Sequence, residues 1–163
     1  MDPSGGRSSS LLFFHFSMSY TKDKTAGMIL QGNIISHGLF ILVTAFLFAK
    51  VLRETPPRYL VAAVLGVCTV YMILRTLRFI HLYRLWKGAR FELENGRAKG
   101  YAADEKLRRG RDFDIPADSI EKAEMIHVPM TQKTPLTALK LTTDSETLVL
   151  LGFVSDEPSE KWD

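Results

Sequence analysis

The sequence contains a single cysteine, Cys68, so it cannot form an internal disulfide bond. Charged residues are missing from two long stretches, because residues 25–49 and 59–74 contain no Asp, Glu, Lys or Arg. Water-soluble domains and disordered chains both distribute charged residues along their length. These absences exclude a disulfide-stabilised scaffold, a simple water-soluble domain and a disordered chain.

Acidic residues are scarce in the first half of the chain. Residues 1–86 hold nine Lys/Arg against three Asp/Glu, a balance of +6, whereas residues 87–163 hold twelve against fifteen, a balance of −3. A nucleic-acid-binding domain carries its basic excess on the folded part, because phosphate contacts supply most of the affinity. The charge distribution therefore argues against a nucleic-acid partner.

Catalytic motifs are also missing. The sequence has no nucleophile elbow, phosphate-binding loop, dinucleotide fingerprint or HExxH motif, and no Cys/His pair with zinc-ligand spacing. Asp112 and Asp114 could act as paired carboxylates, but their alternation with Phe113 favours a solvated strand face. His127 has no acid or nucleophile near it in sequence. We therefore expect a non-enzymatic protein without a cofactor or a metal site.

The uncharged stretches predict two membrane-spanning helices. Gly27–Leu52 is long enough, at about 1.5 Å per residue, to cross a hydrocarbon core of about 30 Å. The second run is Tyr59–Tyr83, and the side chain of Arg75 near its far end can extend to the headgroups. The connector at 53–57 contains two prolines, which cannot continue a helix. A tight helical hairpin is the predicted result.

Positive charges predict the orientation of this hairpin. The connector side offers Lys50, Arg53 and Arg58. The other side offers more: Lys22, Lys24, Arg75, Arg78, Arg84, Lys87 and Arg90. Because Lys and Arg gather on the cytoplasmic side of a membrane, we expect both termini in the cytoplasm. The first residues, MDPSGG, do not resemble the basic start of a secretory signal, and the true start is either Met1 or Met18.

Polar residues within the helices need partners in lipid. Asn33 lies 19 residues before Leu52 and Arg75 lies 18 after Pro57, so the two are level in the membrane. We predict a hydrogen bond between Asn33 and Arg75.

His37 is an ionisable residue inside the first helix, and such residues are functional candidates by default. Two interpretations are open. The imidazole either bonds within a helix interface or ligates a pigment, haem or metal shared with a partner chain. A haem held by both His37 and His81 is disfavoured, because the two histidines differ in depth by about 13 Å.

Small residues mark positions where helices can approach each other closely. Two pairs near the connector are predicted to pack the hairpin together: Ala45 with Ala49, and Ala62 with Gly66. Gly32 and Ser36 form another pair near the opposite surface. This pair either packs the same hairpin or contacts another helix, from a second copy of the chain or from a larger complex.

A small domain formed by an antiparallel β-sheet or barrel is predicted after Gly88, which ends the second helix. Alternating hydrophobicity predicts strands at 90–94, 111–115 and 136–142, and an apolar run predicts one at 147–154. The Asn95-Gly96 hairpin turn predicts a return strand at 97–102, and a further strand is expected at 120–128, between Pro116–Ser119 and Pro129. The expected organisation is an N-terminal cytoplasmic or interfacial segment (1–26), a transmembrane hairpin (27–87), a β domain (88–154) and an acidic tail (155–163).

The strand region carries the segments FDIPADSIEKAEMI at 113–126 and LKLTTDSETLVLLGF at 139–153. With the two preceding helices, this layout resembles bacterial membrane proteins that carry a pleckstrin-homology-like (PH-like) domain. It is also similar to the photosystem I assembly factor family. That fold closes with a C-terminal helix, whereas residues 155–163 are few. We expect the open end of the sheet to stay uncovered or to be covered by the hairpin or another subunit.

The resemblance implies the bacterial inner (cytoplasmic) membrane as the location. With an interaction-type domain and no catalytic motif, the chain is predicted to be an accessory subunit, scaffold or assembly factor of a respiratory or photosynthetic complex. The expected partners are membrane lipids and other integral membrane subunits, and a homo-oligomer is compatible with the pattern.

Lys106, Arg108, Arg109 and Arg111 place four cations within six residues, and we call them the basic cluster. Such a cluster either binds an anionic lipid headgroup or an acidic partner, or is simply a solvated loop. A cyclic-di-GMP-binding PilZ fold is disfavoured, because the cluster lacks the R-x-x-x-R pattern and Asp118-Ser119 lacks the D-x-S-x-x-G spacing.

Overall fold

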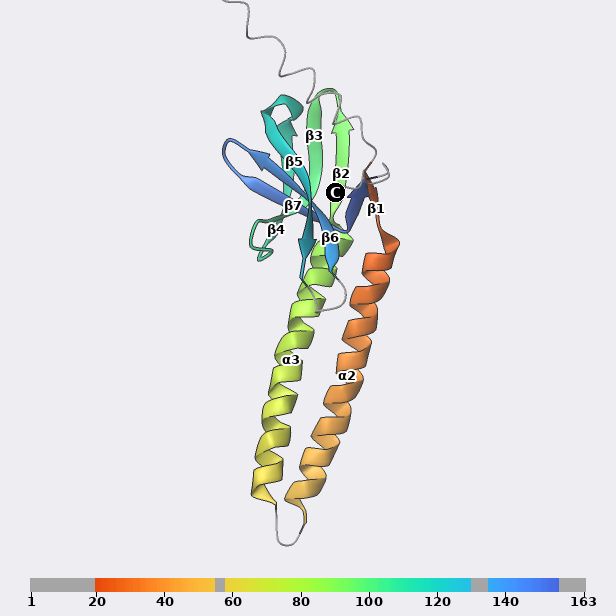
Figure 1. The fold of residues 1–163 in the computed structure, drawn as a ribbon, viewed down its shortest axis with the longest axis vertical. Coiled ribbons are helices and arrows are strands. Elements are labelled where there is room, and N and C mark those ends of the chain that lie inside the picture. The colour runs from red at the N-terminus through yellow and green to blue at the C-terminus, as the bar shows by residue number, and fades with distance from the viewer. Residues whose placement is uncertain (1–19, 55–57, 130–134, 156–163) are drawn as a thin grey trace, which may run out of the picture. The chain divides into compact units, whose positions relative to one another are not determined.

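The structure is a computed structural model that describes residues 20–54, 58–129 and 135–155. Residues 27–84 form one compact unit, and the described residues before and after that range form a second (Figure 1). The elements in chain order are β1 (Tyr20–Lys22), α2 (Lys24–Leu52), α3 (Tyr59–Gly88), β2 (Arg90–Glu94), β3 (Arg97–Asp104), β4 (Gly110–Pro116), the 3₁₀ helix η1 (Ala117–Ser119), β5 (Ile120–Val128), β6 (Leu136–Thr143), β7 (Thr147–Leu151) and β8 (Phe153–Ser155). Both Met18 and prolines 56 and 57 lie outside the described residues, as does the tail beyond 155.

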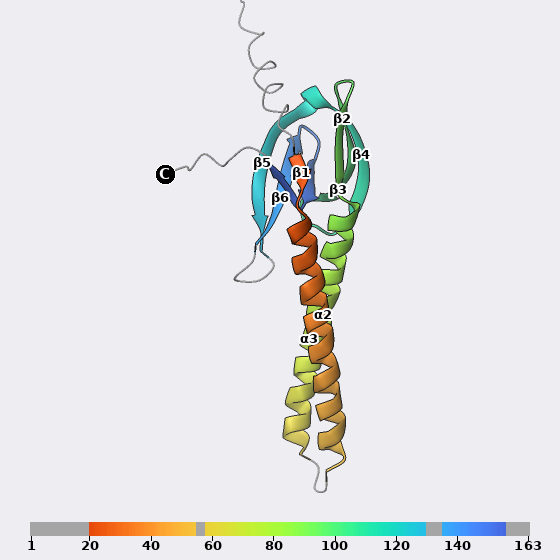
Figure 2. The ribbon, with the colours of Figure 1, turned by 90° about the vertical axis from the view of Figure 1, so that its right-hand side faces the viewer.

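Helices α2 and α3 form the predicted hairpin and run antiparallel, side by side in Figure 1 and overlapping in the turned view of Figure 2. Helix α2 starts at Lys24, three residues before the predicted span, because the carboxylate of Asp23 accepts a hydrogen bond from the Thr25 N–H at 2.8 Å. An aspartate in this position satisfies a backbone donor that the first turn leaves unpaired. Helix α3 ends at Gly88, as predicted.

The two helices expose most of their apolar side chains. The exposed fraction is 82% for Leu60, 72% for Ile35 and 70% for Phe46. Such exposure in water is costly, at about 25 cal/mol per Å². With 29 and 30 residues, both helices are long and apolar enough to cross a membrane.

Contacts inside the hairpin are few and specific. The Thr69 hydroxyl donates a hydrogen bond to the Thr44 hydroxyl at 3.0 Å, from one helix to the other. Nearer the opposite end, the Gln31 amide donates to the Tyr83 hydroxyl at 2.9 Å. These polar contacts between helices fix which faces of α2 and α3 meet.

Of the two pairs of small residues predicted to pack the hairpin near the connector, one lies between the helices and the other does not. Ala62 is buried, and Gly66 lies so close to the Phe48 ring that a Cβ there would be 3.6 Å from it. In contrast, Ala45 and Ala49 are exposed. Their predicted role in hairpin packing is therefore wrong, because the face of α2 that meets α3 here carries Thr44 and Phe48 instead.

The Thr44–Thr69 bond gives a first prediction. Thr44→Val and Thr69→Val should each destabilise the hairpin by about 1 kcal/mol, and the double variant by little more, because they remove the same bond. The measurement is helix loss in mixed micelles as a denaturing detergent is added. Thr76→Val is the control, since that hydroxyl bonds only the Met72 carbonyl of its own helix, at 2.7 Å. Strictly additive effects at positions 44 and 69 would contradict the bond.

The β domain is built from two antiparallel meanders, β2–β3–β4 and β5–β6–β7, which lie on opposite sides of its core in Figure 2. They join through β3 and β7, where Ala103 pairs with Val149 and Asp104 with Leu148. Asn95 and Gly96 both have positive φ, as expected for the tight hairpin turn between β2 and β3. Strands β2 to β7 therefore form one antiparallel sheet, which confirms five of the predicted strands and the first part of the sixth.

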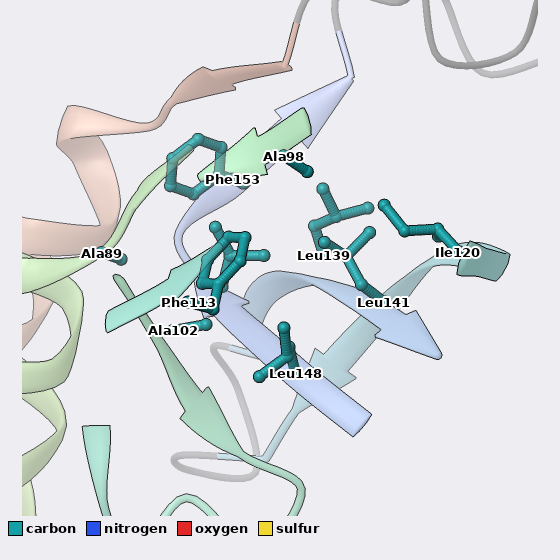
Figure 3. Close-up of a cluster of buried hydrophobic side chains, with 10 residues drawn as sticks. Ala89, Ala98, Ala102, Phe113, Ile120, Leu139, Leu141, Leu148 and Phe153 are labelled. Atoms are coloured by element: carbon teal, nitrogen blue, oxygen red, sulfur yellow. The ribbon is translucent and has the colours of Figure 1, made fainter. Parts of the chain in front are cut away.

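The core of the domain is aliphatic with a few aromatic rings. Its buried side chains, drawn in Figure 3, are Ala89, Ala98, Ala102, Phe113, Ile120, Leu139, Leu141, Leu148, Leu150 and Phe153. Ala89 lies just after the end of α3, and the other side chains belong to the strands of both meanders and to β8. The rings of Phe91 and Phe113 stack across the sheet with centroids 6.5 Å apart.

The last predicted strand, 147–154, is in fact two strands. Gly152 has φ +73° and breaks the run into β7 and β8. Strand β8 then pairs with β1, so that Lys22 lies opposite Phe153. Strand β1 was not predicted, because three residues have no periodicity of their own and their partner is far away in sequence.

Candidate functional site

The predicted hydrogen bond between Asn33 and Arg75 does not form among the described residues. The Asn33 amide donates to the Ile29 carbonyl at 2.8 Å, one turn earlier in α2. Arg75 donates to the Tyr71 hydroxyl at 3.3 Å, and its guanidinium lies 6.0 Å from the Phe79 ring. Each side chain finds a partner on its own helix, which requires no alignment between helices.

His37 packs in the hairpin rather than projecting away from it. Its Nδ1 lies 2.7 Å from the Asn33 carbonyl oxygen, and its ring centroid lies 5.2 Å from that of Phe79 on α3. Because a carbonyl only accepts, this bond places the proton on Nδ1. Both contacts fit a packing role at the helix interface, and the hypothesis that His37 ligates a pigment or haem together with a partner chain stays a prediction.

Gly32 and Ser36 lie on a face of α2 that nothing in the hairpin covers. Both are exposed, and a Cβ built on Gly32 would meet no atom within 4 Å. Of the two interpretations of this pair, packing within the hairpin therefore does not hold among the described residues. The pair remains available to another helix.

The basic cluster lies where β3 turns into β4, and a carboxylate shapes the turn. Asp104 Oδ1 accepts hydrogen bonds from the backbone N–H groups of Arg108, at 2.6 Å, and Arg109, at 3.2 Å. Leu107 has φ +55°, a left-handed conformation uncommon for leucine. Closure of the turn on Asp104 leaves the side chains of Lys106, Arg108 and Arg109 exposed.

The four cations of the cluster are not equivalent. Arg111 forms an ion pair with Glu146, which lies just before β7. Within the described residues, Lys106, Arg108 and Arg109 form no salt bridge. The neighbouring acid Glu105 is engaged with Lys140 at 3.3 Å. The exposed part of the cluster is therefore a net positive surface of three side chains.

A lysine of β1 caps the C-terminal end of α3. Lys22 Nζ donates to the carbonyls of Lys87, at 3.0 Å, and Ala89, at 2.9 Å, and lies 4.8 Å from the centre of the Trp86 ring. A cation is favourable here, because the last carbonyls of a helix carry partial negative charge. Burial lowers the pKa of Lys22 from its ordinary value.

Tyr101 of β3 connects this helix end to the basic cluster. A Cβ on Gly88, the last residue of α3, would lie 2.9 Å from the Tyr101 ring. A Cβ on Gly110, the first residue of β4, would collide with the Tyr101 hydroxyl. The ring thus lies against both glycines, and the basic cluster is held beside the end of α3 within one compact unit.

The other candidate groups are accounted for by ion pairs and exposure. Asp112 accepts from Arg90 at 2.9 Å and Asp114 from Arg97 at 2.7 Å, on the solvated face opposite the buried Phe113. His127 is exposed on β5. The described residues hold no group of three or more His, Cys, Asp or Glu that could bind a metal ion.

The sequence indicated the basic cluster but not the contacts that Lys22 and Tyr101 make. The glycines at 88 and 110 were the only signal for Tyr101, since a ring needs space beside it. No protein family model, curated protein or solved structure matches the chain.

Proposed function

We propose that the chain is a non-enzymatic accessory subunit or assembly factor of a membrane protein complex. The hairpin α2–α3 inserts in the bacterial inner membrane with both termini in the cytoplasm, and the β domain is PH-like. Partner subunits contact the hairpin and the β domain. A respiratory or photosynthetic complex is the class that the sequence resemblance favours.

The observation that carries this proposal is the outward face of the hairpin. Two helices of 29 and 30 residues expose large apolar side chains. Meanwhile Asn33, His37 and Thr44 bond within the hairpin. A bilayer requires apolar side chains on the outside of the hairpin and hydrogen-bonded polar groups within it. Membrane insertion is the simplest account of both facts.

A role without catalysis is supported by what the polar groups do. Carboxylates and cations of the β2–β3–β4 face neutralise one another in ion pairs, and the Nδ1 of His37 bonds the Asn33 carbonyl of its own helix. The unpartnered features are instead surfaces: the small pair Gly32 and Ser36, and the three cations of the basic cluster. Exposed surfaces of this kind are suited to binding a partner rather than to catalysing a reaction.

The test is mild solubilisation of the full chain from its native membrane, followed by identification of the proteins that come with it. We expect integral membrane subunits in fixed ratio. Gly32→Leu with Ser36→Leu should remove helical partners, because bulky side chains keep helices apart. Val67→Leu, at an exposed position of α3, is the matched control. A lone monomer from mild detergent, with no co-purifying subunit, would overturn the proposal.

Orientation gives a second prediction, on labelling by a membrane-impermeant maleimide. In a Cys68→Ser background, Glu54→Cys should react in intact bacterial cells, whereas Asp118→Cys should react only after the cells are opened. The two positions lie on the connector side and in the β domain, and Cys68 is the only native cysteine. In the unsubstituted chain, Cys68 should stay unlabelled until detergent is added. The reverse pattern would place the termini outside, and labelling of both sites in intact cells would contradict a hairpin that crosses the membrane.

A further inference from the structure

We propose that Lys106, Arg108 and Arg109 bind the headgroups of anionic phospholipids in the leaflet where α3 ends. The inference rests on the membrane insertion proposed above and adds a ligand class and a site to it. The ligand is a lipid phosphate that stays in the membrane, not a soluble phosphate or an acidic protein.

The length of α3 brings its last turn to the headgroups. Thirty residues at about 1.5 Å each extend about 45 Å, as far as a whole bilayer with its polar regions. The last turn carries the exposed side chain of Lys87, a residue type typical of the membrane–water interface. Gly88 therefore lies at headgroup level when α3 spans the membrane.

The fold holds the basic cluster at this same end. Tyr101 lies against Gly88 on one side and Gly110 on the other, and the cluster begins only a few residues before Gly110. All of these residues belong to one compact unit. The cluster accordingly stays near the last turn of α3 within that unit.

The electrostatics favour a phosphate rather than internal neutralisation. The acids near the cluster are already used: Glu105 pairs with Lys140, Glu146 pairs with Arg111, and Asp104 accepts two backbone N–H groups. Lys106, Arg108 and Arg109 remain as exposed cations around Leu107. A cytoplasmic leaflet rich in anionic lipid attracts each such side chain near its surface.

The experiment measures which lipids the full chain retains. The protein is equilibrated in micelles that contain equal amounts of phosphatidylglycerol and phosphatidylcholine, and the bound lipids are counted by native mass spectrometry. We expect a clear preference for phosphatidylglycerol. In the triple variant Lys106→Gln, Arg108→Gln and Arg109→Gln, this preference should fall about 100-fold, since each cation contributes about a factor of five.

Two controls separate a site from net charge. The variant Lys106→Arg, Arg108→Lys and Arg109→Lys keeps every charge and should keep the preference. A second triple variant, Arg97→Gln, Lys99→Gln and Lys122→Gln, loses the same charge from ion-paired cations elsewhere and should leave the preference intact. Circular dichroism of each variant checks that the strands are still present.

Three outcomes would overturn the inference. They are no phosphatidylglycerol preference in the wild type, an equal loss in both charge-removing variants, or loss of the lipid on addition of excess inorganic phosphate. The last result would identify a soluble phosphate as the ligand. The maleimide experiment reports insertion independently. If the labelling shows the expected orientation but the protein has no lipid preference, only the lipid site is rejected. The opposite labelling pattern would reject the proposed orientation of the membrane hairpin itself.

Discussion

Replacing Gly152 by alanine should destabilise the β domain by about 3 kcal/mol, a fall in melting temperature of about 15 °C. Two separate effects add. The residue has φ +73°, where an L side chain is strained, and a Cβ there would collide with the Trp86 ring. Its backbone also donates to the Thr137 carbonyl at 2.8 Å and accepts from the Asp23 N–H at 2.7 Å, so it cannot easily move away. The measurement is thermal unfolding of the full chain in micelles, followed by strand circular dichroism.

Gly96 provides a matched control for the backbone effect alone. It has the same φ of +73°, but a Cβ on it would meet nothing within 4 Å. Gly96→Ala should therefore cost only about 1 kcal/mol. In a Trp86→Ala background the collision is removed, and the effect of Gly152→Ala should shrink to the same value. If both alanine variants melted alike in the unsubstituted background, the close approach of Trp86 to Gly152 would be wrong.

Local patterns in the sequence were enough to place nearly every regular element. The uncharged runs predicted both helices, because a charge-free stretch of that length is rare outside a membrane span. Alternation and turn residues predicted the strands, with Arg90–Glu94 and Ile120–Val128 correct at both ends. Asn95-Gly96 predicted the turn, because few residue pairs accept positive φ at both positions. In each case the signal lies within the element itself.

Neither the register between the two helices nor the rotation about their axes was predicted. Asn33 and Arg75 were matched by counting residues from the connector, but Gln31 meets Tyr83 and His37 meets Phe79, so the level of Asn33 on α3 lies beyond Arg75. Each residue turns the helix by about 100°, so neighbours at one height can face opposite directions. The same gap explains why Ala45 and Ala49 are exposed while Thr44 meets Thr69. Polar side chains that bond their own helix leave no trace of the partner helix in the sequence.

Contacts between segments that are far apart in the sequence could not be predicted either, because neither segment carries a local signal of its partner. Strand β1 pairs with β8, which lies more than a hundred residues later, and Lys22 reaches the carbonyls at the end of α3. Arg111 was counted with the other cluster cations, although Glu146 neutralises it. A charge count gives the size of a basic cluster. Only the fold shows which of its members remain available to a ligand.

Substitution at Gly100 should have the other large effect. Gly100 pairs with Phe91 on one side and Phe113 on the other. A Cβ there would collide with the backbone carbonyl of Arg90 and lie 3.1 Å from the Phe113 ring. Because backbone cannot rotate away as a side chain does, Gly100→Ala should cost about 3 kcal/mol or more, and strand β2 should separate from β3.

Hydrogen exchange of the full chain in micelles measures this loss strand by strand. We expect β2 amides to lose protection first, because β3 keeps its pairing with β4 on its other edge. Lys99→Ala is the control: it is the next residue on the same strand, exposed, and should change the melting temperature little. Normal protection of β2 in Gly100→Ala would show that Arg90 and Gly100 do not approach as described. Because only Ala89 separates Arg90 from the last residue of α3, that result would also argue against the position of the basic cluster beside the end of this helix.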